Sequence, residues 1–430
     1  MMTLRLENGQ RVCEEEEEKK VADPIVAPIS YSSSDDEFYD AEEDDYVDGE
    51  EELKNSKRDE LSSKCESMAE DDNEDFDAIY DTTDETDVGD VQQQHGSVIV
   101  HLLSQVSVGM DLTKVTLPTF ILERRSLLEM YADFFAHPDA FIQTPTIESP
   151  EERFISVVRY YLGAFYAARK SGVAKKPYNP ILGETFRCKY SVAGMEESEV
   201  KTTDGPFPGS DINEVTFVAE QVSHHPPVSA FYAEHPARKI SFHAHIWTKS
   251  SFLGLSIGVA NIGSGRVILH ELGEEYVMTF PSGYGRSIMS TPWVELGGKV
   301  KVSCEKTGYY ADIDFLTKPF FGGKAHRISG SLFKDGAKKP FLTIRGEWNS
   351  VLYAKRTEGT EYILVDVKAA KEMKKECVSA TQAKREIEQR QREEAKTRAE
   401  KNEKWTPSMF TQDNQEGWIF TKGLTMRQNV

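Results

Sequence analysis

Residues 240–247 read Ile-Ser-Phe-His-Ala-His-Ile-Trp, and the alternation of apolar and polar side chains in this stretch decides the fold class. Side chains two residues apart on an extended chain lie on the same face, so a period of two predicts a half-buried β-strand. Such strands, without intervening helices, predict an antiparallel barrel or sandwich over roughly residues 185–355. The other alternating stretches are Val215–Ala219, Val228–Ala233, Val267–His270, Tyr276–Phe280, Val300–Cys304, Tyr309–Phe315, Ile328–Phe333 and Phe341–Gly346.

Helical patterns flank the strands. Within residues 117–142 apolar side chains recur at helical spacing up to the breaker His137-Pro138. A second helix is predicted to start at Ser149-Pro150, an N-cap followed by Pro in the first turn, and to run to about residue 172. After the strands, the highly charged residues 378–403 predict a further helix.

The formal net charge of −21 belongs to one end of the chain. Residues 1–95 contain 33 acidic and 8 basic side chains, whereas the remainder contains 39 acidic and 43 basic ones. A like-charged stretch with few apolar residues cannot bury enough surface to offset its ordering entropy, so residues 1–95 are predicted to be a disordered acidic tail. The near-neutral remainder can approach an anionic membrane without strong repulsion.

The cysteines and the hydropathy indicate a cytosolic protein. Five scattered cysteines without a C-x-x-C pair are typical of reduced thiols. No apolar run reaches the roughly 18 to 20 residues that span a bilayer, and no basic-then-apolar signal pattern opens the chain. We therefore expect any membrane association to be peripheral.

Two short segments contain residue types that bind anions. In KPYNPILGE (176–184) two prolines and a glycine fix the backbone, while Lys176 and Asn179 supply a cation and an amide; a plain connector explains the segment equally well. In EQVSHHPP (220–227) the neighbouring His224 and His225 point to opposite sides of an extended chain, which disfavours joint metal binding. Contact with a phosphate fits better, although a structural histidine is the usual reading of an isolated pair.

A third segment lies in the charged C-terminal pattern. Lys384, Glu388 and Arg392 are four residues apart, so on a helix they share one face and Glu388 can brace both cations. A solvated surface without function is the ordinary expectation for so charged a helix.

Together, these three segments resemble the ligand-binding domain of the oxysterol-binding-protein-related family over about residues 97–420. EQVSHHPP resembles the family fingerprint, and the other two segments occur in the family's order. The resemblance implies an α+β, mainly β fold, in which a large near-complete antiparallel β-barrel (176–360) encloses a lipid tunnel. It also implies an N-terminal lid and helices (97–175) and a C-terminal helical region (361–430). The loop within residues 187–214 looks longer than is usual in the family.

The resemblance also assigns ligands. Lys176, Asn179, His224, His225, Lys384 and Arg392, with Glu388, match the residues around the phosphates of phosphatidylinositol 4-phosphate. The stretch 117–126 looks like the subgroup that exchanges phosphatidylserine for this lipid, and Leu117, Thr119 and Ile121 match positions near its second lipid. A sterol is the alternative cargo, and no cofactor or metal is implied.

The tail contains a separate motif, Glu37-Phe-Tyr-Asp-Ala-Glu-Glu43, within an acidic tract. It resembles the FFAT motif that binds VAP receptors of the endoplasmic reticulum, with Glu37, Phe38, Tyr39, Asp40, Ala41 and Glu43 as the matching positions. Acidic side chains steer such a segment to a basic groove, and Phe38 and Ala41 are suited to insert as apolar anchors. The motif implies a cytosolic protein that is peripheral at contact sites between the endoplasmic reticulum and the plasma or another membrane, and no nucleic-acid partner is expected.

Two other classes of function compete with lipid transfer. Gly254-Leu-Ser-Ile-Gly258 matches the G-x-S-x-G nucleophile elbow of hydrolases, with Ser256 as nucleophile, but this motif has meaning only between a parallel strand and a helix. Another strand follows here, so we expect no enzyme. A tether without a cavity, using the tail and the membrane-facing body, is the second alternative.

Overall fold

The computed structural model falls into two units, residues 1–74 and 75–430. In the first unit it describes only β1 (Leu6–Glu7) and β2 (Gln10–Arg11), a short antiparallel ladder. In the second unit the described residues are 122–167, 176–178, 180–224, 226–254, 256–287, 293–319, 322–370, 373, 375–377, 397–398, 405–413 and 417–427. All that follows concerns this second unit.

The helices precede the main sheet. Ser126 caps α4 by accepting a hydrogen bond from the Glu129 amide (3.4 Å), and Ser149 caps α6 through the Glu152 amide (3.4 Å). The predicted start of the second helix at Ser149-Pro150 is therefore confirmed. The helices are α4 (Leu127–Ala132), the 3₁₀ turn η3 (Asp133–Phe135), α5 (Pro138–Ile142), the 3₁₀ turn η4 (Thr144–Thr146), α6 (Pro150–Ala167) and the later 3₁₀ turn η5 (Pro236–Arg238).

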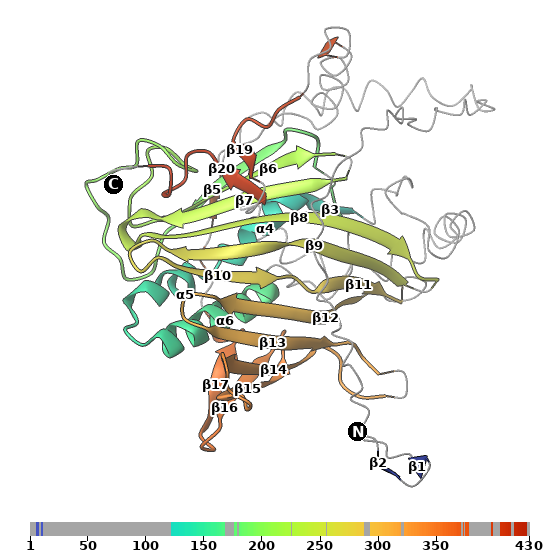
Figure 1. Ribbon diagram of the computed structural model, residues 1–430. Helices are drawn as coiled ribbons and strands as arrows, with labels where there is room; N and C mark the ends of the chain where they lie inside the picture. The colour runs from blue at the N-terminus through green and yellow to red at the C-terminus, as the bar shows by residue number, and fades with distance from the viewer. Residues whose placement is uncertain are drawn as a thin grey trace, which may run out of the picture. The chain divides into compact units, whose positions relative to one another are not determined.

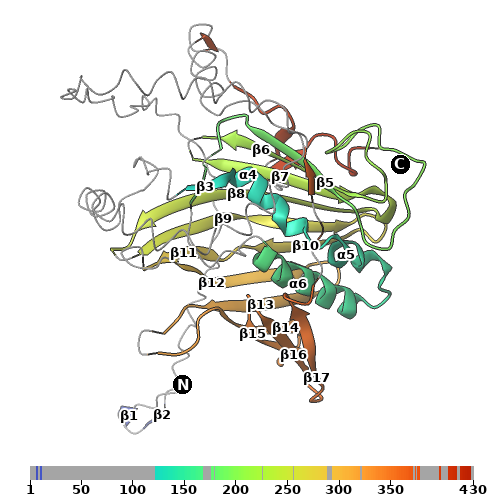
Figure 2. The ribbon, with the colours of Figure 1, turned by 180° about the vertical axis from the view of Figure 1, so that it is seen from behind.

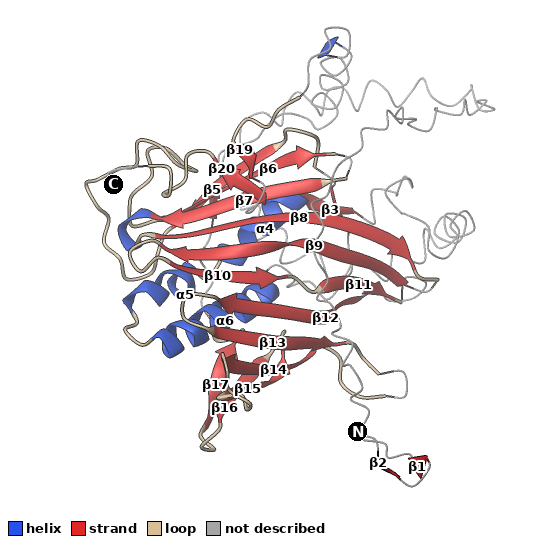
Figure 3. Ribbon diagram, in the orientation of Figure 1, coloured by secondary structure: helices blue, strands red, loops and turns tan. Residues whose placement is uncertain are grey.

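A single antiparallel sheet of 14 strands dominates the fold (Figures 1 and 3). Its order is β17-β16-β15-β14-β13-β12-β10-β9-β8-β7-β6-β5-β18, and β11 pairs with both β9 and β12. The strands are β5 (Thr185–Tyr190), β6 (Val215–Ser223), β7 (Val228–His235), β8 (Ile240–Phe252), β9 (Ser256–Leu269), β10 (Glu274–Thr279), β11 (Ser282–Arg286), β12 (Trp293–Cys304), β13 (Tyr309–Leu316), β14 (Arg327–Lys334), β15 (Leu342–Glu347), β16 (Val351–Arg356), β17 (Glu361–Asp366) and β18 (Lys375–Cys377).

The two edges of this sheet are tied together by a short connection. Only residues 367–374 join β17 at one edge to β18 at the other. Eight residues reach at most about 28 Å, so the sheet has to curl. Helices α4, α5 and α6 all lie on the same face of it (Figure 2). Helix α6 packs against β13 and β17, and α4 packs against β5, β6 and β7.

The face that the helices cover holds the main core. Phe135 lies at its centre, with ring centroids 5.4, 5.7 and 5.5 Å from those of Phe141, Phe217 and Phe242. One ion pair is buried beside it: Arg153 of α6 donates through Nε to Glu274 Oε2 of β10 (2.9 Å). This pair fixes the start of α6 to the sheet.

On the opposite face, the described part of the chain contributes a short covering hairpin. The hairpin of β19 (Phe410–Asp413) and β20 (Gly417–Phe420) packs Phe410 and Phe420 onto β6 and β7, together with Val218, Val222, Val228, Ala230 and Tyr232. Every residue of β7 is therefore buried, because the main core packs against one face of this strand and the hairpin packs against the other. No helix among the described residues is long and apolar enough to cross a membrane.

The mainly β fold with preceding helices agrees with the prediction, and all nine alternating stretches lie on strands or run at most one residue past a strand end. Three details differ. The helical pattern after Ser126 ends in the turn η3, and Pro138, which was expected only to end that helix, starts the new helix α5. Residues 122–126, within the same stretch, form strand β3. The expected helical region over 361–430 is wrong for its described residues other than 397–398: 361–366, 375–377, 410–413 and 417–420 form β17 to β20, where neighbouring strands impose the extended conformation, and the rest are loops and turns.

Candidate functional site

The stretch before the first helix lies beside the KPYNPILGE segment. Strand β3 (Leu122–Ser126) pairs in parallel with β4 (Lys176–Tyr178), so that Leu122 lies opposite Lys176 and Ser126 opposite Tyr178. The backbone of Lys176 is thereby fixed next to the stretch that resembles the lid of the family domain.

A tight turn then leads from KPYNPILGE into the main sheet. Glu184 accepts a hydrogen bond at Oε2 from the Ile181 amide (2.9 Å), and its own amide donates to the Ile181 carbonyl (2.8 Å). Gly183 has φ +78°, and a Cβ at this position would lie 3.2 Å from the Trp405 ring. Glycine is required here both for the backbone conformation and for the close approach of Trp405.

The same turn is hydrogen-bonded to EQVSHHPP. The Gly183 amide donates to the Gln221 carbonyl (2.9 Å), and the Gln221 amide donates to the Glu184 carbonyl (2.9 Å). Thr185 continues this register opposite Glu220. Two of the three predicted segments therefore meet at one end of the β5–β6 pair.

The histidine turn is held by Gln221. Its side-chain amide donates to the Ser223 carbonyl (2.9 Å), and its Oε1 accepts from the Ser229 hydroxyl (2.6 Å). The pairing register shifts between Gln221 and Ser223, which opens the turn that contains the half-buried His224. The turn is thus fixed from both of its strands.

Glu220 joins the C-terminal segment to the same place. This carboxylate is fully buried and accepts from the Ser408 amide (2.7 Å), the Ser408 hydroxyl (2.9 Å) and the Met409 amide (2.9 Å). Sequence reasoning assigned no role to it. A single charged residue inside the otherwise uncharged strand stretch Val215–Val222 is the signal that points to such an anchor.

The other flank of the charged segment is tied to β5. Lys375 of β18 lies opposite Tyr190, and its Nζ lies 3.1 Å from carboxylate oxygens of both Glu129 and Asp133. Burial lowers the pKa of Lys375, but these carboxylates outweigh it and hold the pKa well above its ordinary value. Residues 378–404 are thus flanked by two anchors, on β5 and on β6.

Most of the predicted ligands lie outside the described residues. Lys176 is described only through its backbone in β4, and His224 lies in the turn. The structure brings their two segments together, and nothing is described for the others: Leu117, Thr119, Ile121, Asn179, His225, Lys384, Glu388, Arg392 and the motif at 37–43.

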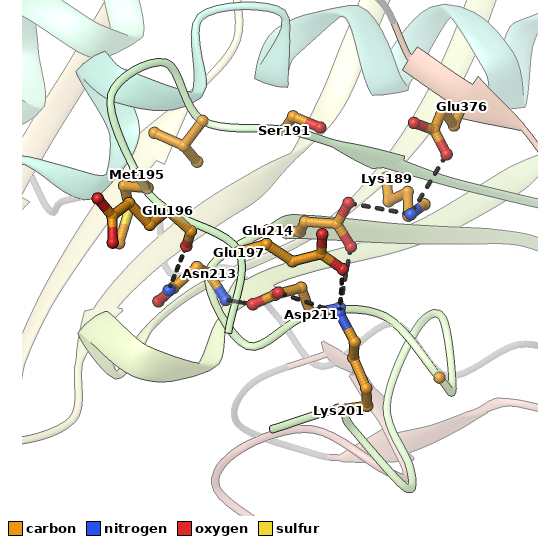
Figure 4. A pocket seen from close by; sticks show the side chains of 12 residues that line it. Lys189, Ser191, Met195, Glu196, Glu197, Lys201, Asp211, Asn213, Glu214 and Glu376 are labelled. Carbon is orange, nitrogen blue, oxygen red and sulfur yellow. Dashed lines mark hydrogen bonds and ion pairs between the residues drawn. The ribbon is translucent and has the colours of Figure 1, made fainter. Parts of the chain in front are cut away.

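A groove of about 320 Å³ lies at the other end of the β5–β6 pair, along the long loop between these strands (Figure 4). Its described lining contains Lys189 and Lys201 among five carboxylates. Lys189 contacts Glu214 (2.9 Å) and Glu376 (3.2 Å). So charged a lining does not suit an acyl chain.

The G-x-S-x-G match that raised the enzyme alternative lies in a hairpin. Ser256 is the first residue of β9, which pairs antiparallel with β8, and its Oγ accepts a hydrogen bond from Arg286 (3.3 Å). A nucleophile elbow needs a helix directly after the serine, and a 14-residue strand takes that place here.

Comparison with known proteins agrees with this arrangement. The profile of the family described as "Oxysterol-binding protein" matches residues 101–378. The chain belongs to the oxysterol-binding protein family. It is 47% identical to human oxysterol-binding protein-related protein 9 over 450 residues, which cover 94% of this chain and 61% of that protein. The chain thus spans about three fifths of the length of this relative.

Two solved structures share the fold. The Osh1 ORD domain in complex with cholesterol matches with a TM-score of 0.57 and 21% identity, over 76% of this chain and 94% of that one. The ORD of Osh3 from Saccharomyces cerevisiae in complex with PI(4)P matches with a TM-score of 0.56 and 19% identity, over 76% and 89%. Membership in this family of lipid-binding domains agrees with the expectation that the chain is not an enzyme.

Proposed function

We propose that this protein takes one lipid out of a membrane, carries it in an apolar interior and delivers it to another membrane. Phosphatidylserine, exchanged for phosphatidylinositol 4-phosphate at contact sites of the endoplasmic reticulum, is the proposed cargo pair. The observation that carries this proposal is the backbone pairing of Gly183 and Glu184 with Gln221, because it joins two family segments at one end of the sheet.

The headgroup phosphates are proposed to bind at this end. Lys176 and Asn179 come from KPYNPILGE, and His224 and His225 from the neighbouring turn. A charged pair of phosphates needs cations and hydrogen-bond donors converging from several elements, and two hydrogen-bonded segments supply them from two sides.

Lys384 and Arg392, braced by Glu388, are proposed as the third group of residues that binds the headgroup phosphates. Lys384 follows Cys377 of β18 by seven residues, and Trp405, which contacts Gly183, follows Arg392 by thirteen. Seven residues reach at most about 25 Å, so the anchor on β5 keeps Lys384 within range of this end of the sheet, whereas the thirteen residues before Trp405 reach at most about 45 Å and set a wider limit for Arg392.

The interior is proposed to compensate the cost of removing acyl chains from a bilayer. At roughly 0.8 kcal/mol per methylene, exposing two long chains to water costs on the order of 20 kcal/mol or more. An apolar interior offsets most of that cost, and the lid segment with Leu117, Thr119 and Ile121 is proposed to lie against the second lipid.

A sterol is the second candidate cargo. It is favoured by one observation, namely that a protein with this fold, Osh1, has been solved with cholesterol and with ergosterol. Either cargo is proposed to occupy the same interior as phosphatidylinositol 4-phosphate. The two lipids therefore compete for one place, and the protein is proposed to work by counter-exchange.

The tail motif Glu37–Glu43 is proposed to dock the protein on a VAP-type receptor of the endoplasmic reticulum. Its acidic side chains would steer it, and Phe38 and Ala41 would insert into the receptor. The disorder predicted for the tail from its charge and composition would let the body reach a second membrane.

Extraction from liposomes tests the headgroup assignment. Changing His224 and His225 together to Ala should lower extraction of phosphatidylinositol 4-phosphate at least tenfold, with phosphatidylserine extraction partly retained. His270→Ala is the matched control, because His270 lies in the turn after β9 and its Nε2 pairs with Ser241 Oγ (2.8 Å). Equal retention of both lipids by the double variant would refute the assignment.

A further inference from the structure

Two cysteines face each other at the edge of the sheet. The pairing of β18 with β5 sets Cys377 directly opposite Cys188, and both are thiols. Directly opposite residues of an antiparallel pair have Cα atoms about 4.5 or 5.5 Å apart, and a disulfide spans about 4.4 to 6.8 Å. The third described cysteine, Cys304, lies opposite Tyr309. Among the described strands, Cys188 and Cys377 are therefore the one pair in register.

The register of these two strands is pinned on both faces. On the face that carries Cys188, Tyr190 donates to the Ala132 carbonyl (2.8 Å), and Lys375 binds Glu129 and Asp133. On the other face, Lys189 forms an ion pair with Glu376 (3.2 Å), which Figure 4 shows at the edge of the groove. These contacts hold the two cysteines opposite each other before any bond forms.

The two thiols differ in access. Cys188 is 0% exposed, and burial raises its pKa well above the ordinary value. Cys377 is exposed at the edge of the sheet. Oxidants react with accessible thiols, so Cys377 is the position that a peroxide reaches first and Cys188 is the resolving thiol.

We propose that Cys377 and Cys188 form a reversible cross-strand disulfide when the protein meets a peroxide. The Cys377 thiol is oxidised to a sulfenic acid, and the peroxide is reduced to water. The Cys188 sulfur then attacks the Cys377 sulfur, the S–O bond breaks, and the hydroxyl leaves as water with the proton of Cys188. Overall, two thiols and one hydrogen peroxide give one disulfide and two waters. A small thiol reverses the bond by exchange.

The bond controls how firmly β18 is attached. This strand has three residues and lies at the sheet edge, directly before the segment 378–404. Three backbone pairs and the ion pairs of Lys375 and Glu376 hold the strand reversibly, and a covalent bond would make the attachment permanent until reduction. The proposal concerns the attachment of this segment and stands independently of which lipid is carried.

Peptide mass mapping under non-reducing conditions tests this. The full chain, with Cys13 and Cys65 changed to Ser, is treated with one equivalent of hydrogen peroxide, and cross-linked peptides are identified with and without reductant. A Cys188–Cys377 cross-link that reductant removes is expected. Hydrogen exchange at the amides of 375–377 should slow at least tenfold in the oxidised protein.

Two variants control the result. Cys304→Ser should keep both the cross-link and the slower exchange, since Cys304 lies on β12 away from this register. Cys377→Ser should abolish both, and it should leave Cys188 unmodified because that thiol is buried. The proposal is overturned if Cys377 is oxidised to sulfinic acid while Cys188 remains a thiol, or if Cys377 cross-links only between molecules.

Discussion

Removing the carboxylate of Glu220 should detach the C-terminal segment from the site. Three donors of Ser408 and Met409 converge on this buried side chain at 2.7 to 2.9 Å. Hydrogen bonds to a charged group contribute roughly 1.5 to 3 kcal/mol each, and part of this is cancelled because Ala no longer buries a charge. A net loss of about 2 to 4 kcal/mol is expected, which corresponds to a roughly 30- to 700-fold larger detached fraction at about 1.4 kcal/mol per tenfold.

Hydrogen exchange followed by mass spectrometry measures this loss in Glu220→Ala. Peptides containing Ser408 and Met409 should exchange faster by about that factor, while β20 stays protected because Phe410 and Phe420 remain packed. Extraction of phosphatidylinositol 4-phosphate should fall at least tenfold. Glu305→Ala, an exposed carboxylate in the β12–β13 turn, should change neither. Unchanged protection at 408–409 in a folded Glu220→Ala protein would refute the anchoring role.

Three further perturbations test the packing. Arg153→Met leaves Glu274 buried without its ion-pair partner, so the free energy of unfolding, measured with urea, should fall by about 3 to 5 kcal/mol; a loss below about 1 kcal/mol contradicts the arrangement. Gly417→Ala places a Cβ in steric clash with the His245 ring at a backbone φ of +82°, so faster exchange across β19 and β20 is expected, and unaltered exchange argues against the packing. Burial and Arg266 lower the pKa of His243 to about 4 in the folded protein. As the pH falls from 6.5 to 4, the unfolded chain is protonated at this residue before the folded one, so the free energy of unfolding should fall by about 3 kcal/mol. Urea unfolding of His243→Phe should show a shallower pH dependence, and a pH dependence identical to that of the original protein contradicts the burial of His243.

The regular strands were predictable because the physics that forms them is local. Ile240–Trp247 alternates because Phe242 and Ala244 pack into the main core while the residues between them face the other way. The start of α6 at Ser149-Pro150 was predictable for a similar reason, since the cap and the fixed φ of proline act within one turn.

The remaining strands depend on partners far away in the chain. Ser282–Arg286 contains two glycines and reads as a turn, but β9 and β12 pair with it on both sides. Lys375–Cys377 has no pattern at all and is extended because β5 lies beside it. Non-local pairing of this kind leaves no periodic signal in the segment itself.

The site was predictable from its motifs only as far as its segments. Neither motif says that Gly183 and Glu184 pair with Gln221, because that contact depends on the register of β5 and β6. The anchoring role of Glu220 depends on residues 188 positions away, so it needed the structure.

Native mass spectrometry of the full chain, purified and then incubated with liposomes that contain phosphatidylserine and phosphatidylinositol 4-phosphate, tests the central claim most directly. The account predicts a protein ion heavier by one lipid, of one kind or the other but never both together. A protein that stays at its bare mass after incubation, or that carries both lipids at once, would contradict an interior that holds a single exchangeable lipid.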